Sequence, residues 1–266
     1  MLASIVKYPF ASSLAGSHGK FGFFVSETES YQKIANELGI TRKSGKGEPL
    51  CYARHPLVYL VEAADDICYE IMDIEDAHKL KILSFEETKE LLLGFFDDGE
   101  KDEICRRMEE EHVTDLNERV VYMRACAIGK LEHDCVDVFV AHEQDILDGT
   151  FEKGLIKHLP QRELDAYKRC AEISRQKIYL SKPVLDIELS GYKIMETLMS
   201  VFIEAAVNPE RFHSQQLIRR VSSQYDISGD QLETRIMAVI DYISGMTDIY
   251  ALDIYQKING ISLPIV

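Results

Sequence analysis

The segment from Pro56 to Leu80 constrains this chain most, because it predicts a long helix with acidic residues gathered on one side. On a helix of 3.6 residues per turn, four carboxylates and a tyrosine fall within about a quarter of a turn of one another. This carboxylate face consists of Glu62, Asp65, Tyr69, Asp73 and Asp76. The opposite face is apolar and is expected to be buried. It carries Leu57, Leu60, Ala63, Ala64, Ile67, Cys68, Ile71 and Ile74.

Two explanations of the carboxylate face remain open on periodicity alone. An ordinary amphipathic helix also turns a charged side to water. However, carboxylates one and two turns apart with no lysine between them repel one another, and a bound cation would relieve that repulsion. The tyrosine among them offers a flat ring and a hydroxyl group. The second explanation, that the face binds a cation, therefore predicts a ligand site.

Composition limits the class of protein. A chain of 266 residues with 46% hydrophobic residues can bury a sizeable core. Its formal charge of −15 argues against a generally basic nucleic-acid or membrane surface, although a local positive pocket is compatible with it. The six cysteines form no CxxC pair, which fits reduced thiols. No stretch approaches the roughly 18 uncharged residues of a membrane span, so we expect a cytoplasmic protein.

The remaining segments predict a mainly α fold. Ser26 with Glu29 and Ser84 with Glu87 each match a capping box, the first opening a helix that runs to about Gly39. Apolar periodicity predicts further helices at about 114–147, 160–177, 191–206, 209–220, 229–243 and 247–258. Between them, Leu185, Ile187 and Leu189 alternate with acidic residues behind a Ser-Lys-Pro turn, so residues 178–189 are expected to form a short β hairpin.

Several stretches of this sequence resemble one known family. AADDICYEIMDIEDA, preceded by RHPL, is similar to a helix of the deoxyguanosine triphosphate triphosphohydrolases in the HD superfamily. LASIVKYP, KFGFF, GYKIMETL and DYISGMTDIYALDIY match in order and approximate spacing, so the resemblance covers essentially the whole chain. It implies the C-terminal part of an HD-type helical bundle, expected as a single helical region over 1–266. Residues 1–80 would complete the active site, and 81–266 would form a helical C-terminal part with the hairpin.

The resemblance also implies roles for individual residues. Asp65 would be a ligand of a divalent metal such as Mg, Mn or another transition metal, which would polarise the α-phosphate and activate a water. The substrate would be dGTP or another dNTP, cleaved to deoxynucleoside and triphosphate. Tyr69 would exclude a 2′-hydroxyl and Asp73 would accept from the 3′-hydroxyl. Lys7, Tyr8 and Lys20 match positions near the nucleotide, where lysines neutralise the triphosphate.

The chain departs from the family pattern at the other ligands. In the family a His, a His-Asp dipeptide and the catalytic His and Glu all precede LASIVKYP, so no catalytic residue is assigned here and the chain alone is expected to be inactive. His133-Asp134 is a His-Asp dipeptide, but it follows Asp65 and is not expected to bind metal. His55 is expected to cap the helix or to have a structural hydrogen bond.

Two other interpretations stay open. The chain could be a non-catalytic nucleotide-binding or oligomerisation module derived from this family, or part of another HD phosphohydrolase such as a cyclic-nucleotide phosphodiesterase. No GxSxG or Walker-type motif supports a serine hydrolase or a P-loop enzyme. The resemblance further implies a homo-oligomer, often a hexamer, and for some members binding of single-stranded DNA.

Overall fold

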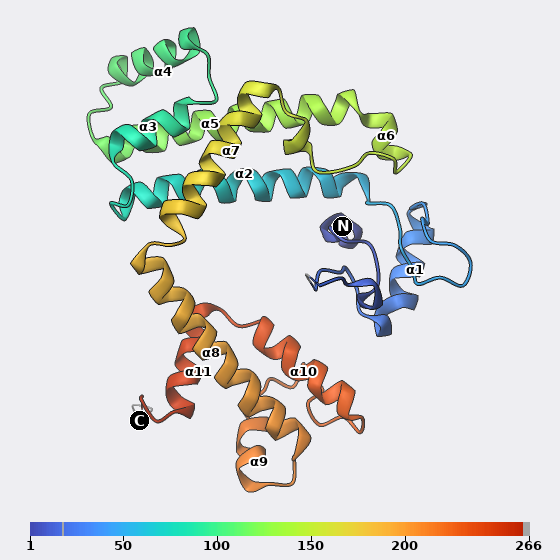
Figure 1. The fold of residues 1–266 in the computed structure, drawn as a ribbon. Coiled ribbons are helices and arrows are strands. Elements are labelled where there is room, and N and C mark those ends of the chain that lie inside the picture. Colours follow the sequence, from blue (N-terminus) through green and yellow to red (C-terminus); the bar gives the residue numbers. More distant parts are fainter. Residues whose placement is uncertain (18, 263–266) are drawn as a thin grey trace. The chain divides into compact units, whose positions relative to one another are not determined.

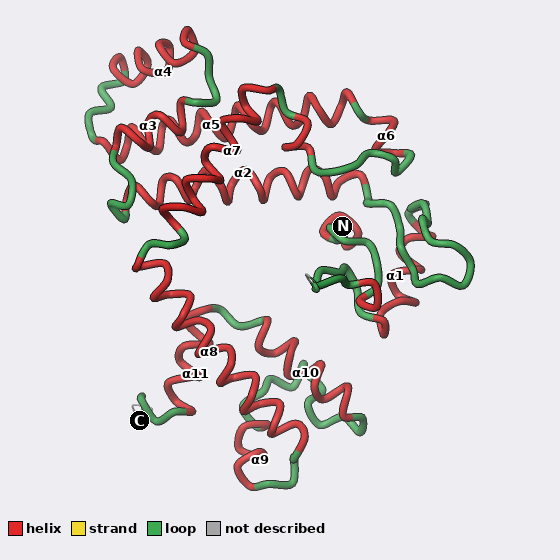
Figure 2. The backbone as a smooth tube through the Cα atoms, in the orientation of Figure 1, coloured by secondary structure: helices red, strands yellow, loops and turns green. Residues whose placement is uncertain are grey.

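The chain forms two compact units, Met1–Leu180 and Ser181–Val266, in a computed structural model that describes residues 1–17 and 19–262. Figures 1 and 2 show that the described residues are helices joined by loops. Three isolated β-bridges occur within this part of the chain, but no β-strand. The expectation of a mainly α protein is confirmed. The two units have separate hydrophobic cores.

The first unit is built around a long helix, α2, that lies beside α5 (Figure 1) and also contacts α3 and α7. Its core contains fully buried side chains from three helices, among them Ile71, Ile74, Leu92 and Leu131. The helices of this unit are α1 (Thr28–Glu37), α2 (Pro56–Lys79), α3 (Phe85–Leu93), α4 (Asp98–Glu110), α5 (Leu116–Ala141), α6 (Glu143–Leu147) and α7 (Gln161–Ile173). Short 3-10 helices are η1 (Leu2–Ile5), η2 (Ser12–Leu14), η3 (Val25–Glu27) and η4 (Leu155–His158), and η5 (Ser174–Ile178) is a π-helix.

The N-terminal segment has a small aromatic core of its own within this unit. The rings of Phe23 and Tyr31 stack with their centroids 4.3 Å apart, and Tyr52 packs against Tyr31. Isolated bridges join Phe10 to Cys51 and Ala11 to Phe23, so the loops on either side of α1 are held together by backbone contacts. The aromatic core and the bridges therefore hold the loops that carry Lys7 and Lys20 in place.

Sequence signals for helix ends were right in one place and wrong in two. Ser84 and Glu87 form the expected capping box, with the Glu87 N–H donating to the Ser84 hydroxyl. Ser26 does not cap α1: the carboxylate of Glu27 accepts from the Phe24 N–H instead, and Ser26 itself lies inside η3. The expected helix over 114–147 is interrupted at His142, between α5 and α6.

The second unit consists of α8 (Lys182–Val207), α9 (Phe212–Ile218), α10 (Leu232–Ser244) and α11 (Asp248–Ile258). Leu198 and Phe202 of α8, Val239 of α10 and Ile254 of α11 are completely buried. These four helices correspond to the four that apolar periodicity predicted, except that α8 starts about nine residues earlier than expected.

The predicted hairpin at 178–189 is wrong, because this stretch contains the end of η5 and the first two turns of α8. Ser181 is extended and precedes α8, Pro183 lies in the first turn, and the Leu185 N–H donates to the Ser181 carbonyl over 3.0 Å. Ser-Lys-Pro therefore starts a helix, a role that proline at the first turn fills as well as it fills a turn. The alternation misled because Ile187 and Leu189 are exposed and do not share a buried face.

None of the helices in the described residues is long and apolar enough to cross a membrane.

We expect the core of the first unit to respond strongly to truncation inside it. Leu92 is completely buried and Leu80, just after α2, is 55% exposed, so the same substitution can be compared at both positions. Leu92→Ala should lower the free energy of unfolding by about 2–5 kcal/mol, because it leaves a cavity. Leu80→Ala should lower it by less than about 1 kcal/mol. Urea denaturation followed by circular dichroism measures both, and equal losses would contradict the assignment of the core.

Candidate functional site

Helix α2 begins where its sequence predicted. Pro56 occupies the first turn, and the Leu57 N–H donates to Nδ1 of His55 over 3.2 Å. Burial lowers the pKa of His55, which favours the neutral ring whose nitrogen can accept this bond. The expected role of His55 as a helix cap is confirmed.

Most of the carboxylate face lies on the outer side of α2, but the side chain of Glu62 is nearly buried. Asp65 and Asp76 are exposed, Tyr69 is 61% exposed, and Asp73 is half-buried. Asp65, Tyr69 and Asp73 follow one another at four-residue intervals, so their side chains stand about one turn apart along the helix. This arrangement offers a carboxylate, an aromatic ring and a second carboxylate to one ligand, and the roles implied by the resemblance stay predictions.

The apolar face is only partly buried, which corrects the helical-wheel expectation. Ala63, Ile67, Ile71 and Ile74 are buried as expected. An apolar stripe of exposed side chains, however, runs between this buried arc and the carboxylate face; its members are Leu57, Val61, Ala64, Cys68 and Met72. Part of the stripe borders a groove of about 380 Å³ between α2 and α5. Its lining includes Leu60, Ala64 and Cys68 of α2 and Ile128 and Val136 of α5.

Two cations from the preceding segments neutralise the first turns of α2. Glu62 has a nearly buried side chain, and its two oxygens pair with Lys7 Nζ at 3.0 Å and Arg54 Nη1 at 2.7 Å. Lys7 also approaches Asp66 at 3.9 Å. Burial raises the pKa of Asp66, and the charge of Lys7 opposes that rise. The carboxylate repulsion noted in the sequence is thus relieved here by side chains from outside the helix.

The other two residues expected near the nucleotide lie close to Lys7. Tyr8 follows it in sequence, and the ammonium of Lys20 lies over the Tyr8 ring, 5.6 Å from the centroid. Gly22 passes so close to the Tyr8 carbonyl and the Val6 side chain that a Cβ atom at this position would clash with both. The structure therefore brings Lys7, Tyr8 and Lys20 together, beside the start of α2.

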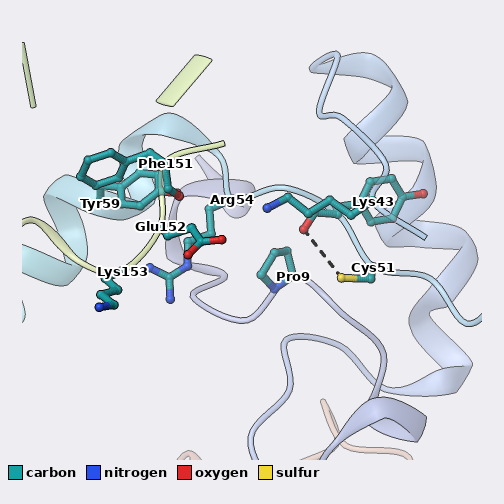
Figure 3. A pocket seen from close by; sticks show the side chains of 9 residues that line it. Pro9, Lys43, Cys51, Arg54, Tyr59, Phe151, Glu152 and Lys153 are labelled. Carbon is teal, nitrogen blue, oxygen red and sulfur yellow. Dashed lines mark hydrogen bonds between the residues drawn. The ribbon is translucent and has the colours of Figure 1, made fainter. Parts of the chain in front are cut away.

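A second pocket, of about 360 Å³, is lined by Arg54 and eight other residues. Figure 3 shows Lys43, Arg54 and Lys153 reaching it from three separate segments, with Glu152 between them and the rings of Tyr59 and Phe151 at one edge. Arg54 is committed to Glu62 and also lies over the Tyr59 ring. Asp65, Tyr69 and Asp73 are not among the residues that line this pocket, so it is separate from the carboxylate face.

Three polar residues at α2 were missed by the sequence analysis. Glu70 is buried and accepts from the Ser174 hydroxyl over 2.8 Å, and burial raises its pKa. Glu75 is buried between Lys79 and Arg124. Tyr179 donates from its hydroxyl to Asp73 Oδ2 over 2.8 Å. Ser174 and Tyr179 are about 100 positions from their partners, so no local pattern could reveal these contacts.

The residues that the structure describes do not by themselves form a metal site. Within residues 1–17 and 19–262 no group of three or more His, Cys, Asp and Glu side chains is placed to hold an ion. The His-Asp dipeptide of α5 is divided between two partners: Asp134 pairs with Lys130 at 2.7 Å, and the exposed His133 lies 3.8 Å from Asp137. Asp65 alone offers one carboxylate, fewer donors than a bound divalent metal requires.

Comparison with known proteins gives two kinds of match. Residues 158–257 match the model of the phosphohydrolase-associated domain. The chain is 31% identical to a deoxyguanosinetriphosphate triphosphohydrolase-like protein of Pseudomonas aeruginosa (strain LESB58). The match covers 99% of this chain and 60% of that protein. A protein of the same description from Synechocystis is 30% identical over 98% of this chain and 59% of its own length.

A deoxyguanosinetriphosphate triphosphohydrolase of Salmonella arizonae is more distant, with 24% identity over 91% of this chain and 54% of that protein. The chain thus spans a little more than half the length of the curated relatives that it matches. The identity extends through both structural units, since nearly every residue of this chain is aligned. The chain is thus similar, over nearly all of its length, to deoxyguanosinetriphosphate triphosphohydrolase-like proteins.

Proposed function

We propose that this chain forms the sugar- and phosphate-binding part of a deoxynucleoside triphosphate triphosphohydrolase. The reaction is dNTP plus water to deoxynucleoside plus triphosphate, with dGTP as the first substrate to test. The single observation that carries the proposal is the row of Asp65, Tyr69 and Asp73 on the exposed side of α2, at one-turn spacing. Similarity to the deoxyguanosinetriphosphate triphosphohydrolase-like proteins supplies the chemical class.

The chemistry of the row fits a deoxyribose. A tyrosine ring packed against C2′ leaves no room for a 2′-hydroxyl, and a carboxylate one turn further accepts from the 3′-hydroxyl. The cluster of Lys7, Tyr8 and Lys20 lies by the first turns of the same helix, where Lys7 contacts Glu62 and Asp66. We assign these residues to the triphosphate, for which Lys7 would exchange a carboxylate partner for a phosphate oxygen.

The metal requires ligands beyond this chain's described residues. When bound, a divalent ion would polarise the α-phosphate, and Asp65 is the residue here that we assign to it. The remaining ligands would come from the part of the family fold to which this chain has no counterpart. The apolar stripe of Leu57, Val61, Ala64, Cys68 and Met72 adjoins Asp65, and a segment docked on it would bring its own ligands beside that carboxylate.

Oligomerisation and DNA binding are proposals by family alone. We expect a homo-oligomer such as a hexamer in the cytoplasm, with single-stranded DNA as a further partner to test. The contrasting function is a non-catalytic nucleotide-binding or oligomerisation module, which the lack of a metal-holding group in the described residues favours.

Replacing Asp65 tests the metal assignment. In the complete protein, meaning this chain with the segment that bears the other ligands, Asp65→Asn should lower release of tripolyphosphate from dGTP roughly 100-fold or more, since losing even an outer partner of a metal costs 10- to 100-fold. Bound Mn²⁺, measured by calorimetry, should fall with it. Asp76→Asn, an exposed position on the same face, is the control and should change neither value. Normal Mn²⁺ binding by Asp65→Asn would refute the assignment.

Tyr69 is expected to set the choice of sugar. Tyr69→Ala should lower the ratio of kcat/KM for dGTP to kcat/KM for GTP by about 10- to 100-fold. The reason is that it removes the ring that occupies the space of a 2′-hydroxyl. Met72→Ala, also on the exposed side of α2, should leave that preference intact. A Tyr69→Ala protein that still rejects GTP as well as the parent would exclude this role.

The chain by itself should hydrolyse little or no dGTP, because one aspartate cannot hold an ion in place of a complete set of ligands. The purified 266-residue chain can be incubated with dGTP and Mn²⁺ or Mg²⁺, and tripolyphosphate measured by ion chromatography. Turnover that withstands further purification would show that the site is complete without other residues.

A further inference from the structure

Tyr179 is a polar residue that touches the proposed sugar site from a distant part of the chain. Its hydroxyl donates to Asp73 Oδ2 over 2.8 Å, and its ring lies near that of Tyr69, with centroids 6.5 Å apart and planes inclined by 43°. It is therefore in reach of both residues that we assign to the deoxyribose. It lies just after η5, at the end of the first unit.

The π-helix η5 puts Tyr179 in this position. The Tyr179 N–H donates to the Ser174 carbonyl over 2.9 Å, an i to i+5 bond. In an α-helix, side chains five positions apart point about 140° away from each other. The wider π turn reduces this angle, and Ser174 and Tyr179 both contact α2.

The spacing on α2 matches this turn. Ser174 donates to Glu70, and Tyr179 donates to Asp73, three residues further along the same face of α2. The Ser174 contact is completely buried and fixes η5 on the helix, while the Tyr179 contact is nearer the surface. Two donors five residues apart thus meet two carboxylates three residues apart, an arrangement that a regular α-helix in place of η5 would not give.

The hydrogen bond also affects the charge of Asp73. Burial raises the pKa of Asp73, and the bond from Tyr179 opposes that rise. Tyr179 therefore favours the ionised carboxylate, which accepts hydrogen bonds but cannot donate them. Because Tyr179 donates to Oδ2, it also restricts the rotation of the carboxylate.

We propose that Tyr179 is a positioning residue that orients Asp73 to accept a hydrogen bond from the 3′-hydroxyl of the bound deoxynucleotide. This inference rests on the proposed function. It predicts that Tyr179 acts on recognition of the 3′-hydroxyl specifically. A merely structural tie between η5 and α2 would affect every nucleotide alike.

The test compares dGTP with 2′,3′-dideoxyGTP, which lacks the 3′-hydroxyl. In the complete protein, Tyr179→Phe should lower kcat/KM for dGTP roughly tenfold, the order expected for a hydrogen bond to a charged group, and should change kcat/KM for dideoxyGTP less than about twofold. Tyr167→Phe is the matched control, since its hydroxyl ties α7 to the Asp66 carbonyl of α2 over 3.2 Å. It should leave the ratio of the two kcat/KM values unchanged.

A second comparison links the effect to Asp73. In an Asp73→Ala background, adding Tyr179→Phe should cause no further loss of preference for dGTP over dideoxyGTP, because the two residues act through one contact. An equal fall with both substrates in Tyr179→Phe, or an unchanged preference, would overturn the inference while leaving the proposed function in place. Absence of tripolyphosphate release by the parent protein with every metal tried would instead remove the proposed function, and the inference with it.

Discussion

The burial of one arc of α2 determines what the rest of the first unit can display. Ile67, Ile71 and Ile74 are almost or completely inaccessible, and they pack against helices that come later in the chain. Because helical geometry fixes the angles between side chains, this burial leaves Asp65, Tyr69 and Asp73 on the outer side. The hydrophobic core thus sets the orientation of polar groups that never enter it.

The negative charges of α2 need positively charged or hydrogen-bonding partners, and these partners differ along the length of the helix. Lys7 and Arg54 pair with Glu62 near the start, and Lys79 and Arg124 flank the buried Glu75 near the end. Between them Asp65 is left exposed to solvent. The carboxylates that packing forces inside are paired with cations or hydroxyls, as buried charges must be, whereas the exposed Asp65 is available to a ligand.

The sequence was a good guide to several features that depend on neighbouring residues, although the capping box expected at Ser26 was wrong. It predicted the bounds of α2, the cap at His55 and the capping box at Ser84, because each is determined within about four positions. The hairpin was wrong because Ser-Lys-Pro suits a turn and a helix start alike, and only tertiary packing decides between them. The α4 helix was overlooked although Asp97 and Glu100 form a capping box. For the site, the sequence located the exposed row on α2 but not Tyr179, whose partner is 106 positions away.

The π-helix gives the segment between Ser174 and Tyr179 an unusual kind of constraint. Its side chains at intermediate positions, such as Arg175 and Gln176, are exposed and can vary in kind without disturbing α2. Its length cannot vary in the same way, because adding one residue rotates everything beyond it by about 100°. Tyr179 would then point away from Asp73 although both residues were still present. In related sequences, therefore, the number of residues in this turn should carry more information about the site than their identity does.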